Sequence, residues 1–234
     1  KIARNSNKLS TGFVGTGILN QTLSQCGATN TAYNLLLQRG NPSWIYSIDQ
    51  GATTIWERWD SYTKDQGFHD VGMNSFNHYS YGAVEEWMYR YMAGIEADES
   101  APGFKHFILQ PNPDRRTSLP EGQERITSVD ATFKSYYGDI KSAWVIRTDG
   151  NLSYTATVPA NTTATLYLPL SNASDVVYEG ATVADKAEGV TFVKKENGKA
   201  VYELKSGSYA FGVNVPVAGA HSLGQKAGNP VFEG

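Results

Sequence analysis

The stretches Gly51 to Asp60, GATTIWERWD, and Asn74 to Gly82, NSFNHYSYG, each place one ionisable side chain among aromatic rings. Glu57 lies between two tryptophans, and His78 lies between a phenylalanine and a tyrosine. Flat apolar rings pack on sugar faces, while a few placed polar groups orient hydroxyls and transfer protons. The two stretches therefore indicate a carbohydrate site, although packing of aromatic rings in a core is the alternative explanation.

Around these stretches, residues 12–94 show the apolar spacing of short helices joined by short loops. Gly27 is placed to end the first helix, and Asn41-Pro42 offers a capping residue followed by proline at the first helical position of the third. The predicted helices cover Thr16 to Cys26, Thr29 to Gly40, Pro42 to Gly51 and Val84 to Met92. The apolar stripe of the last helix consists of Val84, Trp87, Met88, Tyr91 and Met92. Short helices of this kind are typical of a helical hairpin array or of part of an α/α barrel.

The second half of the chain has a different periodicity. Residues 93–116 are rich in proline and are predicted to form a connection, with a short strand at His106 to Gln110. After Ile126 the apolar residues alternate, and Asp149-Gly150 and Asn197-Gly198 are hairpin turn signals. The predicted strands are Ser128 to Tyr136, Lys141 to Arg147, Leu152 to Val158, Ala164 to Leu168, Val176 to Glu179, Val190 to Lys194, Ala200 to Leu204 and Tyr209 to Val213. They indicate an antiparallel β-sandwich, whereas the tail Ala218 to Gly234 shows no clear pattern.

Composition excludes several classes of function. The net charge of −3 and the isoelectric point near 5.8, without any Lys/Arg-rich run, argue against nucleic-acid binding. No apolar run approaches the roughly 18 residues that span a membrane. The single cysteine, Cys26, allows no intrachain disulfide and is expected to be a small buried hydrophobic residue near a helix end. Because no grouping of metal-ligating residues or phosphate-binding loop is present, we expect no cofactor.

Four stretches together resemble a known family: GFVGTGILNQTLSQCG (12–27), NPSWIYSIDQGATTIWERWD (41–60), NSFNHYSYGAVEEWMYRYMAGI (74–95) and PGFKHFILQP (102–111). They are similar to the C-terminal part of bacterial α-L-rhamnosidases, glycoside hydrolase family 78. The resemblance implies an α+β chain of two domains. Residues 1–110 are expected to be the C-terminal portion of a six-hairpin α/α barrel, and residues 111–234 a C-terminal antiparallel β-sandwich.

The resemblance also implies an activity, the removal of terminal α-L-rhamnose from glycans or glycosides with inversion. Glu57 matches the position of the general base, His78 matches a histidine that contacts the sugar, and Trp44 and Trp56 are expected to help line the pocket. The general acid is expected in an upstream half of the barrel that is missing from this chain. We therefore expect the chain by itself to show little or no hydrolysis.

Simpler roles remain open for each of these residues. Glu57 is otherwise a surface carboxylate beside Arg58, and His78 a structural histidine in a loop before a helix. Asp60 and Asp70 are expected to cap helices or form salt bridges, and His69 and His106 to be structural.

Two alternative functions also remain open. One is a non-catalytic carbohydrate-binding protein whose sandwich binds glycan through Trp144 and the Tyr136-Tyr137 pair, which core packing explains equally well. The other is an α/α-barrel glycosidase or phosphorylase of a different family. The expected partner is a rhamnose-containing glycan or glycoside. We expect the chain to bind neither nucleic acid nor a membrane. For the compartment, we favour a periplasmic or secreted location slightly over a cytoplasmic one.

Overall fold

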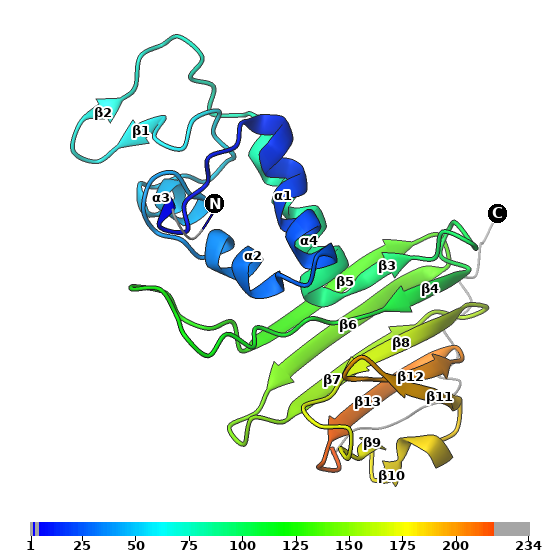
Figure 1. Cartoon of the computed structure of the whole chain (residues 1–234). Coiled ribbons are helices and arrows are strands. Elements are labelled where there is room, and N and C mark those ends of the chain that lie inside the picture. Colours follow the sequence, from blue (N-terminus) through cyan, green and yellow to red (C-terminus); the bar gives the residue numbers. More distant parts are fainter. Residues whose placement is uncertain (1, 3–4, 218–234) are drawn as a thin grey trace, which may run out of the picture. The chain divides into compact units, whose positions relative to one another are not determined.

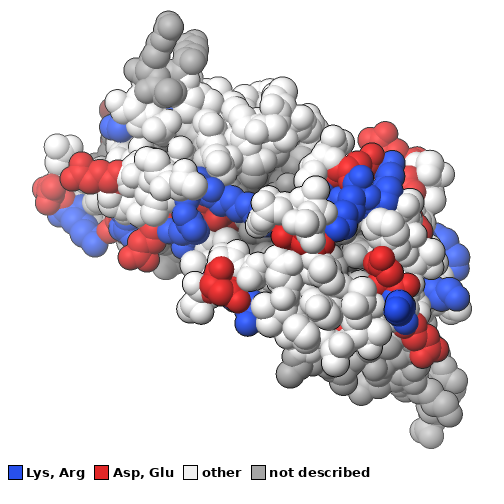
Figure 2. Space-filling model, turned by 60° about the horizontal axis from the view of Figure 1, so that its bottom comes forward, with Lys and Arg blue, Asp and Glu red and all other residues white. Residues whose placement is uncertain are grey.

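The chain folds into two compact units in the computed structural model, which describes residue 2 and residues 5–217 (Figure 1). The first unit contains the described residues up to Met88 together with Asp114–Ile126, and the second contains Tyr89–Pro113 and the residues from Thr127 onward. The tail 218–234, for which the sequence shows no pattern, lies outside the described residues. Acidic and basic side chains are interspersed over the face shown in Figure 2, in keeping with the small net charge of −3.

The first unit is mainly helical, as its apolar spacing predicts. Its helices are α1 (Phe13–Gln25), α2 (Thr29–Leu36), α3 (Trp44–Asp49), the 3₁₀ helix η2 (Tyr79–Ala83) and α4 (Val84–Trp87). The π-helical turn η3 (Met88–Ala93) continues α4, and all of it after Met88 belongs to the second unit. A two-stranded hairpin, β1 (Tyr62–Thr63) and β2 (Gly67–Phe68), lies between α3 and η2. The predicted helices are therefore present, although several of their ends differ.

Two of the predicted helix ends are wrong. The helix α2 ends at Leu36 rather than Gly40. The helix α3 begins at Trp44, so Pro42 precedes it instead of occupying its first position. Its cap is Ser43, whose extended backbone lets the side-chain Oγ accept a hydrogen bond from the Tyr46 amide at 3.1 Å. A serine hydroxyl satisfies an otherwise unpaired amide of the first turn, which explains why the helix starts there.

The predicted apolar stripe is buried at Val84, Trp87 and Met92. Trp87 packs edge-on against Tyr33 of α2, with 5.3 Å between ring centroids, and its indole donates to Ser24 Oγ of α1 at 2.8 Å. The helices α1 and α4 run side by side (Figure 1). Met88 and Tyr91 stay partly exposed because the helix continues as a π-helical turn, which shifts the register of the stripe.

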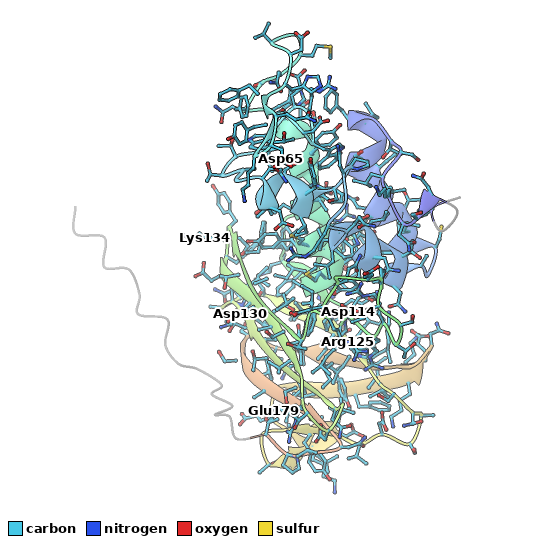
Figure 3. All side chains as sticks on the ribbon, turned by 90° about the vertical axis from the view of Figure 1, so that its left-hand side faces the viewer. Asp65, Asp114, Arg125, Asp130, Lys134 and Glu179 are labelled. Atoms are coloured by element: carbon cyan, nitrogen blue, oxygen red, sulfur yellow. The ribbon has the colours of Figure 1, made fainter. Side chains whose placement is uncertain are left out.

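A buried ion pair holds the segment Asp114–Ile126 against α2. Arg116 donates to both carboxylate oxygens of Asp114, at 2.9 and 2.8 Å, and to the side-chain oxygen of Asn34 at 2.9 Å. The two charged side chains are almost completely buried. Burial raises the pKa of Tyr33, whose ring lies below the Arg116 guanidinium, and the Asp114 carboxylate raises it further. Figure 3 labels Asp114 on this segment and Arg125 near its end.

The second unit is a sandwich of two sheets. The six-stranded sheet has the order β10-β9-β13-β7-β6-β5 and the five-stranded sheet the order β11-β12-β8-β4-β3. Their strands are β3 (Ile95–Ala97), β4 (His106–Leu109), β5 (Ser128–Ser135), β6 (Gly138–Ile146), β7 (Leu152–Val158), β8 (Thr163–Pro169), β9 (Val177–Glu179), β10 (Thr182–Val183), β11 (Val190–Glu196), β12 (Lys199–Leu204) and β13 (Gly207–Val213). The 3₁₀ helix η4 (Ala184–Lys186) follows β10. Figure 3 labels Asp130 and Lys134 on β5 and Glu179 on β9.

Rings from both sheets form the sandwich core. Tyr202 of β12 stacks on Phe211 of β13 across the two sheets, with ring centroids 6.0 Å apart. Trp144 of β6 is fully buried, and its indole donates to the Met92 carbonyl at 2.8 Å. Every predicted strand from Ser128 onward is present, and both hairpin signals lie at turns between paired strands.

The sandwich departs from the sequence prediction in one respect. The strand β4 pairs in parallel with β8, so the fold is not purely antiparallel. The predicted short strand at His106 to Gln110 is present as β4, whereas β3 comes from the stretch that was predicted to be a connection. The mixed helix-and-sheet architecture is confirmed, whereas the partial barrel and the boundary at residue 110 remain predictions.

Candidate functional site

Backbone hydrogen bonds join the two aromatic stretches that the sequence singles out. The Glu57 amide donates to the Ser75 carbonyl at 2.8 Å, and the Ser75 amide donates to Glu57 Oε2, also at 2.8 Å. The His78 amide donates to the Ile55 carbonyl at 2.8 Å. Residues 55–57 are therefore held against residues 75–78, and the Glu57 carboxylate is anchored through one of its two oxygens.

The Glu57 side chain faces a pocket of about 270 Å³ in the first unit. The pocket is lined by Phe13, Glu57, Arg58, Trp59, Asp60, Met73 and Tyr81. Its walls thus combine three aromatic rings and a thioether with two carboxylates and a guanidinium. A concave site with apolar walls and a few converging polar groups is suited to a small ligand.

The aromatic wall is built in layers. Trp59 stacks on Tyr81, with centroids 3.8 Å apart and an interplanar angle of 18°. Trp44 packs edge-on behind Trp59 at 5.3 Å, and its indole donates to the Tyr81 carbonyl at 2.8 Å. Trp44 and Trp56 are buried and line a smaller cavity of about 60 Å³, which shares Trp59 and Tyr81 with the pocket. In this structure Trp44 supports the wall and Trp56 packs edge-on against Phe76, and direct contact of either residue with a sugar remains a prediction.

His78 stands next to the pocket, through its contact with Phe13. The two rings stack with centroids 4.5 Å apart. The His78 Nδ1 atom is buried and has no hydrogen-bond partner among the described residues. Because this nitrogen is buried, any contact of His78 with a ligand would have to involve another part of its partly exposed ring, and that contact remains a prediction.

Two of the charged pocket residues form an ion pair. Arg58 Nε lies 3.6 Å from Asp60 Oδ1, which agrees with the expectation that Asp60 forms a salt bridge. Burial raises the pKa of the Tyr81 phenol, and the nearby Arg58 charge opposes that rise. Tyr81 therefore stays protonated at neutral pH and can donate a hydrogen bond into the pocket.

The remaining candidate residues have structural surroundings. His106 contacts the hydroxyls of Thr163 and Thr165, at 2.7 and 2.9 Å, and so belongs to the sandwich. Asp70 accepts from the Gly72 amide in a turn rather than capping a helix. Cys26 is exposed, contrary to its expected burial, because it follows the last residue of α1 at the surface.

The three aromatic residues of the sandwich that were candidates for glycan binding differ in their exposure. Trp144 is in the core, whereas Tyr136 and Tyr137 are exposed at the turn between β5 and β6. Among the described residues, no three His, Cys, Asp or Glu side chains are grouped as metal ligands, and no helix is long and apolar enough to cross a membrane.

Sequence reasoning missed Phe13, Tyr81 and Met73 as pocket residues. Tyr81 lies in the second aromatic stretch, so its place in the sequence could have indicated that it belongs to the site. Phe13 begins α1, far away in the sequence, and carries no local sign of its role. Met73 lies in a loop without apolar periodicity.

The pocket holds an anchored carboxylate among aromatic rings, a combination that suits a small ligand. Residues 1–92 match the bacterial α-L-rhamnosidase six-hairpin glycosidase domain, and residues 94–182 match the bacterial α-L-rhamnosidase C-terminal domain. The resemblance inferred from the sequence is therefore confirmed, and these residues belong to the bacterial α-L-rhamnosidase family.

Individual relatives agree with this assignment. The α-L-rhamnosidase of Streptomyces avermitilis is 43% identical over 88% of this chain and 18% of its own length. An α-L-rhamnosidase of Formosa agariphila is 37% identical over 90% of this chain and 21% of its own length. The solved structure of the Streptomyces avermitilis α-L-rhamnosidase complexed with L-rhamnose has a TM-score of 0.76 at 42% identity, covering 90% of this chain and 18% of that one. The chain thus spans about one fifth of the length of these relatives.

Proposed function

We propose that this chain is part of an inverting α-L-rhamnosidase and that Glu57 is its general base. The observation that carries the proposal is the Glu57 carboxylate, anchored by the Ser75 amide in an aromatic pocket of a chain that belongs to the α-L-rhamnosidase family. The substrate class is a glycan or glycoside that ends in α-L-rhamnose.

An inverting glycosidase uses two carboxyl groups, about 6.5–9.5 Å apart, on opposite sides of the anomeric carbon. One protonates the glycosidic oxygen as its bond to the anomeric carbon breaks. The other removes a proton from the water whose oxygen bonds to that carbon from the opposite face. Since the Ser75 amide holds Glu57 Oε2 at 2.8 Å, Oε1 is the oxygen that we assign to this water.

The general acid must come from a different carboxyl group. Asp60 is the other carboxylate of the pocket, but it forms an ion pair with Arg58, with 3.6 Å between Asp60 Oδ1 and Arg58 Nε. We therefore propose that the acid lies in a part of the enzyme outside this chain. His78, whose ring stacks on the pocket residue Phe13, is proposed to contact the sugar, and Trp44 and Trp56 are proposed to help line the pocket.

The test is the variant Glu57→Gln in the whole enzyme that contains this chain. A glutamine keeps the shape and the hydrogen bond from Ser75 but cannot take a proton from water. We expect kcat on 4-nitrophenyl α-L-rhamnoside to fall by about 10²- to 10⁴-fold, with KM changed much less. Proton NMR of the wild-type reaction should show β-L-rhamnose as the first product.

The matched control is Glu85→Gln, which removes an exposed carboxylate from α4 and should leave kcat within about twofold. Near-normal turnover by Glu57→Gln removes Glu57 from the role of base. Initial release of α-L-rhamnose by the wild type contradicts the inverting mechanism.

A further inference from the structure

Two apolar side chains lie beside the Glu57 carboxylate in the pocket. Phe13 is held between His78, at 4.5 Å between ring centroids, and Tyr81, at 5.1 Å. Met73 is 70% exposed although it lines the same pocket, so its thioether is available to a ligand. The polar lining residues, Glu57, Arg58 and Asp60, are consecutive or nearly so, and the apolar pair comes from other elements.

The two residues that follow Met73 are held by hydrogen bonds. Asn74 Nδ2 donates to the Ser61 carbonyl at 3.2 Å and to the His69 carbonyl at 3.3 Å. The Ser75 amide, two residues after Met73, binds Glu57 itself. The backbone beside Met73 is therefore tied to Glu57, and the Met73 side chain lines the same pocket as the Glu57 carboxylate.

The stereochemistry of the proposed reaction says which part of the sugar faces these residues. In an α-glycoside of rhamnose, the leaving oxygen on C1 and the methyl carbon C6 lie on opposite faces of the ring. In an inverting reaction the water attacks from the face opposite the leaving oxygen. The water, and hence Glu57 as its base, therefore lies on the face that carries the C6 methyl group.

We propose that Met73, together with Phe13, binds the C6 methyl group of rhamnose and so selects a 6-deoxy sugar. The inference rests on the proposed function, since it takes Glu57 as the base. A hydroxyl added at C6, as in L-mannose, loses its hydration against the thioether and the ring without gaining a hydrogen bond. Apolar contacts of this kind discriminate against an added hydroxyl by about 10²-fold at most.

The experiment compares 4-nitrophenyl α-L-rhamnoside with 4-nitrophenyl α-L-mannoside, which differ only by the hydroxyl on C6. The whole enzyme is assayed as wild type, as Met73→Gln and as Met73→Leu. We expect Met73→Gln, which keeps the length of the side chain but is polar, to lower the ratio of the two kcat/KM values about tenfold. Met73→Leu keeps the apolar contact and should hold the ratio within about twofold.

Competitive inhibition by free L-rhamnose and free L-mannose gives a second measurement that does not depend on turnover of the mannoside. The ratio of their inhibition constants should shift with Met73→Gln in the same direction. An unchanged ratio in Met73→Gln, or an equal change in Met73→Leu, overturns the assignment of Met73. Failure of the proposed function has a different signature, because wild-type enzyme then hydrolyses no α-L-rhamnoside or the Glu57→Gln variant stays active.

Discussion

At the scale of the residue, Arg116 shows how a buried charge is accommodated. Its guanidinium binds both oxygens of Asp114 and the side chain of Asn34, so the buried donors have partners. A buried charge is tolerated only when it is paired and hydrogen-bonded. The sequence motif DRR does not reveal which arginine is buried, because that depends on the packing of residues 114–126 against α2.

Replacement of Arg116 by methionine should therefore destabilise the chain strongly. We expect Arg116→Met to lower the free energy of unfolding by about 3–5 kcal/mol, because Asp114 is left buried without its partner. Urea unfolding, followed by tryptophan fluorescence, measures the loss. The control is Arg39→Met, which removes an exposed pair with Asp49 and should cost less than about 1 kcal/mol. Similar losses in the two variants would contradict the structural role of Arg116.

At the scale of the element, the apolar periodicity of the sequence predicted most helices and strands. It failed where a capping side chain or a distant contact determines where an element begins or ends. Asn197 and Gly198 both have positive φ angles, of 48° and 71°, and lie at the hairpin turn that the sequence predicts between β11 and β12. By contrast, the start of α3 is decided by the Ser43 hydroxyl and not by the more conspicuous Asn41-Pro42. The π-helical turn after Trp87 leaves no trace in the apolar spacing.

Gly94 determines how β3 approaches β4. Its φ angle is +80°, and a Cβ atom placed on it would lie 2.1 Å from the Gln110 carbonyl carbon. We expect Gly94→Ala to lower the free energy of unfolding of the sandwich by about 3 kcal/mol or more, since the backbone must shift as well as bear strain. Gly150→Ala is the control, because Gly150 has nearly the same φ of +79° but no atom within 4 Å of such a Cβ.

The Gly150→Ala control separates the strain of a positive φ angle from the close approach of Gln110 to position 94. Gly150→Ala should cost only the conformational penalty of about 1–2 kcal/mol. Chemical denaturation of both variants gives the comparison. Equal losses would mean that the close approach of Gln110 adds nothing to the requirement for glycine at position 94.

At the scale of the whole molecule, the proposed base Glu57 has no suitable acid beside it among the residues that line the pocket. Of the two carboxylates that line the pocket, Asp60 is paired with Arg58. We therefore expect the purified 234-residue chain to fold but to give no measurable turnover of 4-nitrophenyl α-L-rhamnoside. Circular dichroism confirms folding, and release of 4-nitrophenol measures activity. Turnover that is abolished by Glu57→Gln would show that the chain supplies its own acid.

The sequence by itself determined the succession of helices and then strands, the turns at Asp149-Gly150 and Asn197-Gly198, and Glu57 as the residue to examine. These features depend on short stretches, whose apolar period and turn residues act locally. The tertiary structure alone decided the pairing of Glu57 with Ser75, the contact of Phe13 with His78, and the parallel pairing of β4 with β8. Each of these joins residues that are distant in the chain, so packing of the whole unit, and not local preference, brings them together.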